Sequence, residues 1–196
     1  MKNSNLSQKY FFLFWQPRKD LFKKISQTKY GNQFLIVINY IIWVFFFFIS
    51  YLLIKQDTNV FWQLFSATII SEIIEKILKT KSFWKRPLHI NHNVLPNGLL
   101  KSWYQKGSFP SGHAIKATFF FILLLHAGIL ISPFYFLIVA LPLVLIRIIL
   151  GLHYPIDVLG GIIIGLIIGL LIKQIQFPDF MINFIQPIFN FIFLLK

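Results

Sequence analysis

The sequence predicts an all-α integral membrane protein: a helical bundle of five to six transmembrane helices with an amphipathic amino-terminal segment. Three observations predict this class. The 196 residues are 57% hydrophobic and include 24 phenylalanines, whereas a soluble domain is about 45–50% apolar. Several apolar runs reach the roughly 20 residues that a helix needs to cross a bilayer. Prolines, glycines and short polar stretches separate these runs, as breakers between helices do.

The apolar runs divide the chain into two parts. Residues 1–33 are polar and basic except for a short aromatic patch at 10–15, which is too short to span and favours an interfacial amphipathic segment. Residues 34–196 form the membrane-embedded domain. Spans are expected at about residues 34–54, 60–78, 111–130, 133–150 and 155–172. The apolar tail, 177–196, is interrupted by polar residues, so it either spans or lies in the interface.

The second span carries charges that suit pairing along a helix. Glu72 and Lys76 are four residues apart, as are Glu75 and Lys79, and the acid comes first in both pairs. This order is the favourable one on a helix face. Charged side chains at membrane depth face protein rather than lipid. We therefore expect this face to turn into the bundle, with Glu75 neutralising Lys79 and helping to aim it.

Glycine and proline set the limits of the fifth span. Gly151 ends the span before it, and Pro155 opens it, because proline suits the first turn of a helix. Gly161, Gly165 and Gly169 follow at intervals of four, a spacing that lets two helices approach closely. This face fits ordinary helix packing, and it also fits a tight contact that holds the start of the span near other polar clusters.

Charge and cysteine content narrow the function classes. The net charge is +13, from 19 Lys and Arg against 6 Asp and Glu, which favours contact with anionic lipid headgroups. Nucleic-acid binding is disfavoured, because the basic residues lie beside apolar spans and form no separate polar module. The chain has no cysteine, which excludes disulfides, thiolate metal sites and a cysteine nucleophile.

Three short polar clusters stand among the apolar runs. The first is Lys79 with Arg86-Pro87, the second is Pro110-Ser111-Gly112-His113, and the third is Arg147 with His153 and Asp157. The loop at 80–110 and the turn at 151–155 are separated by two spans. Both therefore lie on the same side of the membrane, where the three clusters can meet.

The basic residues of these clusters point to a phosphate. Lys79, Arg86 and Arg147 would repel one another at close range unless an anion joined them. Arginine offers a planar fork of donors suited to phosphate oxygens, and lysine a point charge. Ser111 and Gly112 stand where a helix begins, and backbone N–H groups at a helix start bind anions. Each basic residue taken alone is equally typical of a side chain that extends to the interface.

The two histidines supply the reactive groups. His153 and Asp157 are four residues apart at the start of the fifth span. A carboxylate there accepts from one imidazole nitrogen, which fixes the tautomer and leaves the other nitrogen to attack. His113 lies beside the proposed phosphate cradle, where it can protonate a leaving oxygen. A lone histidine in such a place is more often a structural hydrogen-bond partner.

The spacing Lys-x6-Arg-Pro, Pro-Ser-Gly-His and Arg-x5-His-x3-Asp closely resembles the three-part signature of the type 2 phosphatidic acid phosphatase superfamily. The resemblance covers about residues 72–165. It implies that His153 is the nucleophile and forms a phosphohistidine, that Asp157 orients it, and that His113 is the general acid. The implied ligands of the phosphoryl oxygens are Lys79, Arg86, Ser111, Gly112 and Arg147. The implied mechanism needs no metal and no other cofactor, in agreement with the lack of a carboxylate cluster.

One position departs from the signature. The third motif commonly has serine before its arginine, and here that position is Ile146. A hydroxyl contact to phosphate is therefore missing, while the nucleophile, acid and orienting carboxylate remain. Three aromatic residues near the motifs suit anchors at the membrane interface or the lining of an entry for lipid chains: Trp84, Trp103 and Tyr104.

These features predict a membrane phosphatase that hydrolyses a lipid-linked phosphate monoester or diphosphate, with the lipid and the bilayer as its partners and no nucleic acid. A lipid phosphotransferase is a close alternative, since a phosphohistidine can discharge to an alcohol or phosphate instead of water. A non-catalytic lipid-binding or transport protein is a second alternative. A haloperoxidase is disfavoured, because the chain is short and membrane-embedded. The exact lipid and the oligomeric state are not encoded in these motifs.

The resemblance implies a multi-pass protein of the bacterial inner membrane with its site facing the periplasm. Five spans before the tail place the basic residues 1–33 on the same side as the site. By the positive-inside rule these residues favour the cytoplasm. The two indications oppose each other, and the periplasmic placement depends on the resemblance.

Overall fold

Each of the expected apolar runs forms a helix in the computed structural model, which describes residues 12–15, 25, 28, 30–81, 83–87, 107–128 and 133–193. The described residues contain no strand, so the all-α prediction is confirmed. Most of residues 1–33, together with Trp103 and Tyr104, lie outside the described residues. The helices are α3 (Gly31–Gln56), α4 (Asn59–Thr80), α7 (Gly112–Ala127), α8 (Pro133–Ile149), α9 (Pro155–Ile172) and α10 (Asp179–Phe193).

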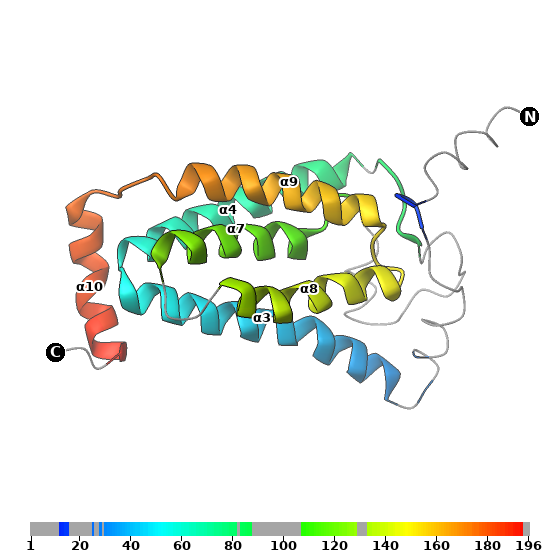
Figure 1. Ribbon diagram of the computed structural model, residues 1–196, viewed down its shortest axis with the longest axis horizontal. Helices are drawn as coiled ribbons and strands as arrows, with labels where there is room; N and C mark the ends of the chain where they lie inside the picture. The colour runs from blue at the N-terminus through cyan, green and yellow to red at the C-terminus, as the bar shows by residue number, and fades with distance from the viewer. Residues whose placement is uncertain are drawn as a thin grey trace, which may run out of the picture.

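Five of these helices lie lengthwise beside one another, and α10 crosses one end of the bundle (Figure 1). The other end holds the start of α7, the end of α8, the start of α9 and the segment 83–87. At the α10 end, the Trp62 indole N–H of α4 donates to the Met181 carbonyl at 3.1 Å. The two ends of the bundle therefore differ: one is closed by a crossing helix and the other gathers the polar motifs.

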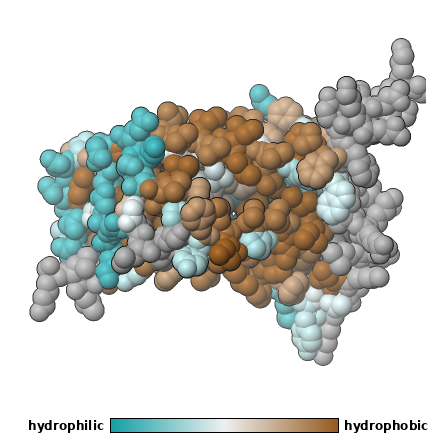
Figure 2. Space-filling model, in the orientation of Figure 1, coloured by the Kyte–Doolittle hydropathy of each residue, from teal (hydrophilic) through white to brown (hydrophobic). Residues whose placement is uncertain are grey.

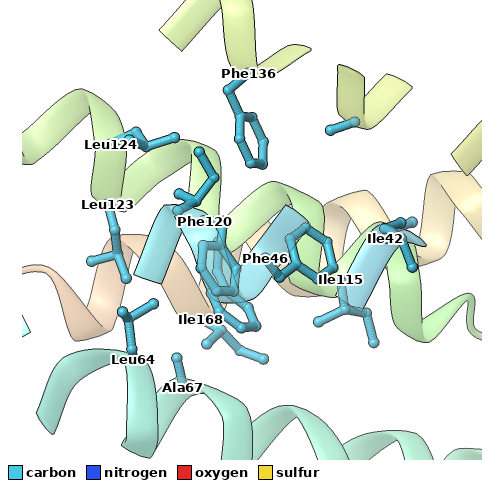
Figure 3. Packing of buried hydrophobic residues seen from close by; sticks show 14 of the residues in the cluster. Ile42, Phe46, Leu64, Ala67, Ile115, Phe120, Leu123, Leu124, Phe136 and Ile168 are labelled. Carbon is cyan, nitrogen blue, oxygen red and sulfur yellow. The ribbon is translucent and has the colours of Figure 1, made fainter. Parts of the chain in front are cut away.

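Aromatic and aliphatic side chains fill the space between the helices. Phe46 of α3 stacks on Phe120 of α7 with ring centroids 4.8 Å apart, and Figure 3 shows Ile115 and Ile168 beside this pair. Phe136 of α8 is 1% exposed and belongs to the same cluster. Close van der Waals packing of this kind holds helices together where the hydrophobic effect does not favour their association.

The glycine face of α9 makes the closest helix contact. A Cβ on Gly161 would lie 2.6 Å from the Ser111 carbonyl oxygen, and one on Gly165 would lie 2.5 Å from another backbone oxygen of α7. A Cβ on Gly169 would lie 2.9 Å from a side chain of α7. The close approach lets the Ser111 N–H donate to the Asp157 carbonyl at 3.0 Å. The packing prediction is confirmed, and the same contact joins the second motif to the third.

The outer surface is strongly apolar. Figure 2 shows hydrophobic residues over the middle of the visible face and hydrophilic residues gathered toward the end where α10 lies. Two helical segments are long and apolar enough to cross a membrane, Gln33–Gln56 and Pro155–Ile172, while α7 and α8 are apolar but shorter. By length and composition, the described helices therefore do not establish a bundle of five to six spans, which stays a prediction.

Candidate active site

All three polar clusters meet at the end of the bundle opposite α10 (Figure 1). The Arg86 guanidinium donates through Nη1 to the Leu152 carbonyl at 3.0 Å, and the Ser111 N–H donates to the Asp157 carbonyl. The first and second clusters therefore each bond directly to the turn or helix that carries the third. The eight residues predicted for the site all belong to the described part of the chain.

The turn between α8 and α9 places His153. Gly151 has φ = 71°, a left-handed conformation that favours glycine. The Leu152 and His153 N–H groups then both donate to the Arg147 carbonyl, at 2.9 and 3.3 Å. Pro155 starts α9 at its first position, as expected. The chain thus reverses tightly and holds His153 next to Arg147 at the head of α9.

His153 lies between a carboxylate and a guanidinium. Its Nδ1 is 3.5 Å from Asp157 Oδ2, and its Nε2 is 3.5 Å from Arg86 Nη1. Burial lowers the pKa of His153 to about 4; the nearby Asp157 carboxylate opposes this shift, and the Arg86 charge adds to it. The imidazole is therefore neutral at physiological pH. One nitrogen is directed to the acid, and the other faces the cationic side of the site.

Asp157 is fully buried and accepts from several donors. The Trp84 indole N–H donates to Oδ1 at 2.9 Å. The Ser108 hydroxyl and the Tyr154 N–H both donate to Oδ2, the latter at 2.7 Å. Sequence reasoning did not single out Ser108 and assigned Trp84 only to the interface or an entry. The positions of these two residues in the sequence could have indicated their role: Trp84 falls inside the Lys-x6-Arg-Pro motif, and Ser108 comes just before the second motif.

Arg147 is buried and contacts the second histidine. Its Nη2 lies 2.8 Å from His113 Nε2. A guanidinium has only donors, so His113 accepts through Nε2 in this arrangement. The Trp43 ring lies edge-on to the imidazole, with centroids 5.9 Å apart. The general acid predicted from the motif and one predicted phosphate ligand are therefore in direct contact.

The start of α7 carries a buried hydroxyl. Ser111 is the N-cap residue, makes no side-chain capping bond, and is fully buried. Its Oγ has no hydrogen-bond partner among the described residues. A Cβ on Gly112 would overlap the carboxylate of Glu75. A hydroxyl with spare hydrogen-bonding capacity thus stands at a helix N-terminus, a place that favours an anion.

Glu75 lies between two lysines. It forms an ion pair with Lys79, as the sequence predicted, and its Oε2 is 3.6 Å from Lys116 Nζ. Lys116 also pairs with Glu72 at 2.7 Å, so Glu72 reaches across to α7. Sequence reasoning had noted Glu72 only with Lys76. The Lys116 side chain is buried beside the site and was not anticipated.

The Ile146 side chain packs against the apolar cluster of Leu35, Leu150 and Leu152. This accounts for an apolar residue at the position where the signature commonly has serine: here the side chain completes a contact between α8 and α3.

The part of the chain described by the structure contains no group of three His, Cys, Asp or Glu side chains placed to hold a metal ion.

The described residues of the amino-terminal aromatic patch, 12–15, contact this end of the bundle. The Leu13 carbonyl accepts from the Ile156 N–H in the first turn of α9 at 3.2 Å. The Phe14 ring lies against Trp84 and Tyr154, with centroids 5.5 and 5.4 Å away. Leu13 and Phe14 therefore lie at the same end as the site, the side expected for this part of the chain.

Comparison with known proteins agrees with these motifs. A model of the PAP2 superfamily matches residues 60–180, more than half of the chain and all eight predicted site residues. No curated protein and no solved structure matches the chain.

Proposed function

Because the chain belongs to the PAP2 superfamily, whose activity is of the phosphatase type, we propose that it is a membrane phosphatase that hydrolyses a lipid-linked phosphate monoester or diphosphate. The observation that carries the proposal is the placement of His153. Its Nδ1 faces the buried Asp157, and its Nε2 faces Arg86. This is the arrangement that an imidazole nucleophile needs beside an anion-binding group.

In the proposed reaction, His153 Nε2 attacks phosphorus while the bond from phosphorus to the leaving oxygen breaks. His113 gives a proton to that oxygen, and Asp157 stabilises the positive charge on the phosphorylated imidazole. Water then gives a proton to His113 and attacks phosphorus, the P–N bond breaks, and inorganic phosphate leaves. The phosphoryl oxygens are held by Lys79, Arg86, Ser111, Gly112 and Arg147, with no metal and no other cofactor.

The contact between Arg147 and His113 bears on how a phosphate would bind. Arg147 donates to His113 Nε2, which prevents that nitrogen from carrying a proton. Phosphate oxygens are better acceptors for a guanidinium, because the hydrogen bonds are charge-assisted and bidentate. A bound phosphate would therefore replace His113 as the hydrogen-bond acceptor of Arg147. His113 Nε2 could then carry the proton that it donates to the leaving oxygen.

The apolar exterior supports a lipid substrate. Large hydrophobic side chains are exposed along α3, α4, α8 and α9, such as Phe47 of α3, Ile73 of α4 and Ile163 of α9. The site lies at one end of these helices, where a headgroup would sit if the acyl or prenyl chain lay along the bundle. We place the protein in a bacterial inner membrane as a multi-pass protein with its site facing the periplasm.

The test is phosphate release by the purified protein from a panel of prenyl diphosphates, phosphatidylglycerophosphate and lipid A phosphates. His153→Gln is expected to reduce turnover at least about a thousandfold. His126→Gln is the matched control, because His126 is exposed at the other end of α7. Acid-labile labelling of the protein by a radiolabelled substrate, lost in His153→Gln, would identify the phosphohistidine.

Three outcomes would change the proposal. If the wild type and His153→Gln are equally inert on the whole panel, a non-catalytic lipid-binding protein is the better assignment. If labelled phosphate appears on a second lipid rather than in solution, the protein is a phosphotransferase. If a chelator abolishes activity, the metal-free mechanism is wrong.

A further inference from the structure

The Asp157 carboxylate is held by donors from outside its own helix. Trp84 comes from the segment that follows α4, and Ser108 comes from the segment that precedes α7. Together with the Tyr154 N–H they occupy both carboxylate oxygens. The His153 Nδ1 contact, at 3.5 Å, is longer than the Trp84 and Tyr154 bonds. The group that orients the nucleophile is therefore itself held from two distant parts of the chain.

Both outside donors are fixed in place. The Ser108 N–H donates to the Trp84 carbonyl at 3.2 Å, which ties the two segments together. The Trp84 ring packs against Phe14 and Phe109, with centroids 5.5 and 5.4 Å away. Ser108 is fully buried. Neither side chain can turn away without breaking other contacts, so the carboxylate has one preferred rotation.

The donors to Asp157 also reduce the negative charge that its carboxylate presents to His153. Ser108, Tyr154 and His153 all approach Oδ2, while Trp84 takes Oδ1. A hydrogen bond to a carboxylate is roughly twice as strong as one between neutral groups. Each such bond uses negative charge that would otherwise stabilise a proton on the imidazole. Removing one donor should therefore strengthen the pull of Asp157 on His153.

We propose that Trp84 and Ser108 are positioning residues: they hold the Asp157 carboxylate in one rotation and draw on its charge, so that His153 presents a neutral Nε2 to the substrate. The kinetic part of this proposal rests on the proposed phosphatase function, whereas the effect on the His153 imidazole does not. Neither residue touches the reacting atoms, and each acts through Asp157.

The test uses Trp84→Phe and Ser108→Ala, which keep most of the packing and remove one donor each. Trp62→Phe is the matched control, because it removes an indole hydrogen bond at the other end of the bundle. Ser71→Ala is the second control, because Ser71 is as buried as Ser108 and bonds within α4. The His153 titration is followed by NMR of histidine-labelled protein and assigned by its absence in His153→Gln.

Both test variants are expected to raise the pKa of His153 above its value of about 4, and both controls should leave it unchanged. Turnover should fall about ten- to a hundredfold with KM changed less than about twofold, the loss expected for one hydrogen bond to a charged group. The acid limb of the pH–rate profile should move to higher pH. The other charged or titratable groups near His153 are the same in all variants: Arg86, Lys79, Glu75, His113 and Arg147.

A His153 titration that coincides with that of the wild type in both variants would overturn the proposal, whatever happens to the rate. An upward shift in a protein inactive on every lipid would support the positioning role and refute the proposed function. If one variant fails to fold, the other decides, since each removes a separate donor.

Discussion

Replacing Gly161 by alanine should reduce activity more than it reduces stability. A Cβ at this position would lie 2.6 Å from the Ser111 carbonyl oxygen, whereas ordinary contact begins at 3.4 Å. Because the obstacle is backbone, α7 and α9 must part by about 0.8 Å. The bond from the Ser111 N–H to the Asp157 carbonyl, now 3.0 Å, would then stretch to about 3.8 Å, beyond hydrogen-bond range.

Two magnitudes follow from this displacement. Overpacking by one methyl group typically costs about 1–3 kcal/mol of stability. A misplacement of about 1 Å at a reacting centre can cost roughly a hundredfold in rate. The shift separates the helix that carries Asp157 from the one that carries Ser111 and His113. We therefore expect turnover to fall by a factor between about ten and a hundred.

The assay pairs turnover on the best lipid substrate with thermal unfolding in the same detergent. Gly169→Ala is the matched control, because its Cβ would lie 2.9 Å from a side chain of α7 at the far end of the same helix contact. It should lose stability with less than about a threefold loss of turnover. If Gly161→Ala keeps as much activity as Gly169→Ala, the glycine face does not align the site.

Three further results are expected. The pKa of His153 in the folded protein, about 4, lies below its ordinary value of 6.5, so the unfolded chain binds more protons between these two pH values. The free energy of unfolding should therefore rise by up to about 3 kcal/mol from pH 4 to 6.5. Denaturant titrations should show less of this rise in His153→Gln. Glu75→Gln should destabilise the fold by about 1–3 kcal/mol, since it removes the acid that pairs with the half-buried Lys79, whereas Lys116 keeps its pair with Glu72. It should also tighten inhibition by inorganic phosphate; unchanged inhibition would mean that Glu75 does not balance the site's charge. The third result concerns orientation, and the chain has no native cysteine to interfere with it. A cysteine introduced at Lys81, at the site end, should react with a membrane-impermeant maleimide added to the periplasm, and one introduced at Gln176, at the α10 end, should not. The reverse pattern would put the site in the cytoplasm.

The helices were predictable because their signal is local. Apolar runs of helical length, closed by Gly151 and opened by Pro155, gave α8 and α9 close to the bounds observed. The pairing of Glu75 with Lys79 followed from a spacing of four on one helix. The sequence left the tail either spanning or interfacial. In the structure α10 crosses the end of the bundle (Figure 1), and a hydrogen bond from Trp62 of α4 to the Met181 carbonyl supports this direction.

The sequence by itself determined the residue types of the candidate site and the side of the bundle on which they gather, because an even number of helices returns the chain to the same end. Only the tertiary structure decided that Trp84 and Ser108 hold Asp157, that Lys116 joins Glu75, and that Ile146 packs on an apolar cluster. These pairings join segments far apart in the chain. They depend on the closeness and rotation of neighbouring helices, which a periodic pattern within one helix does not encode.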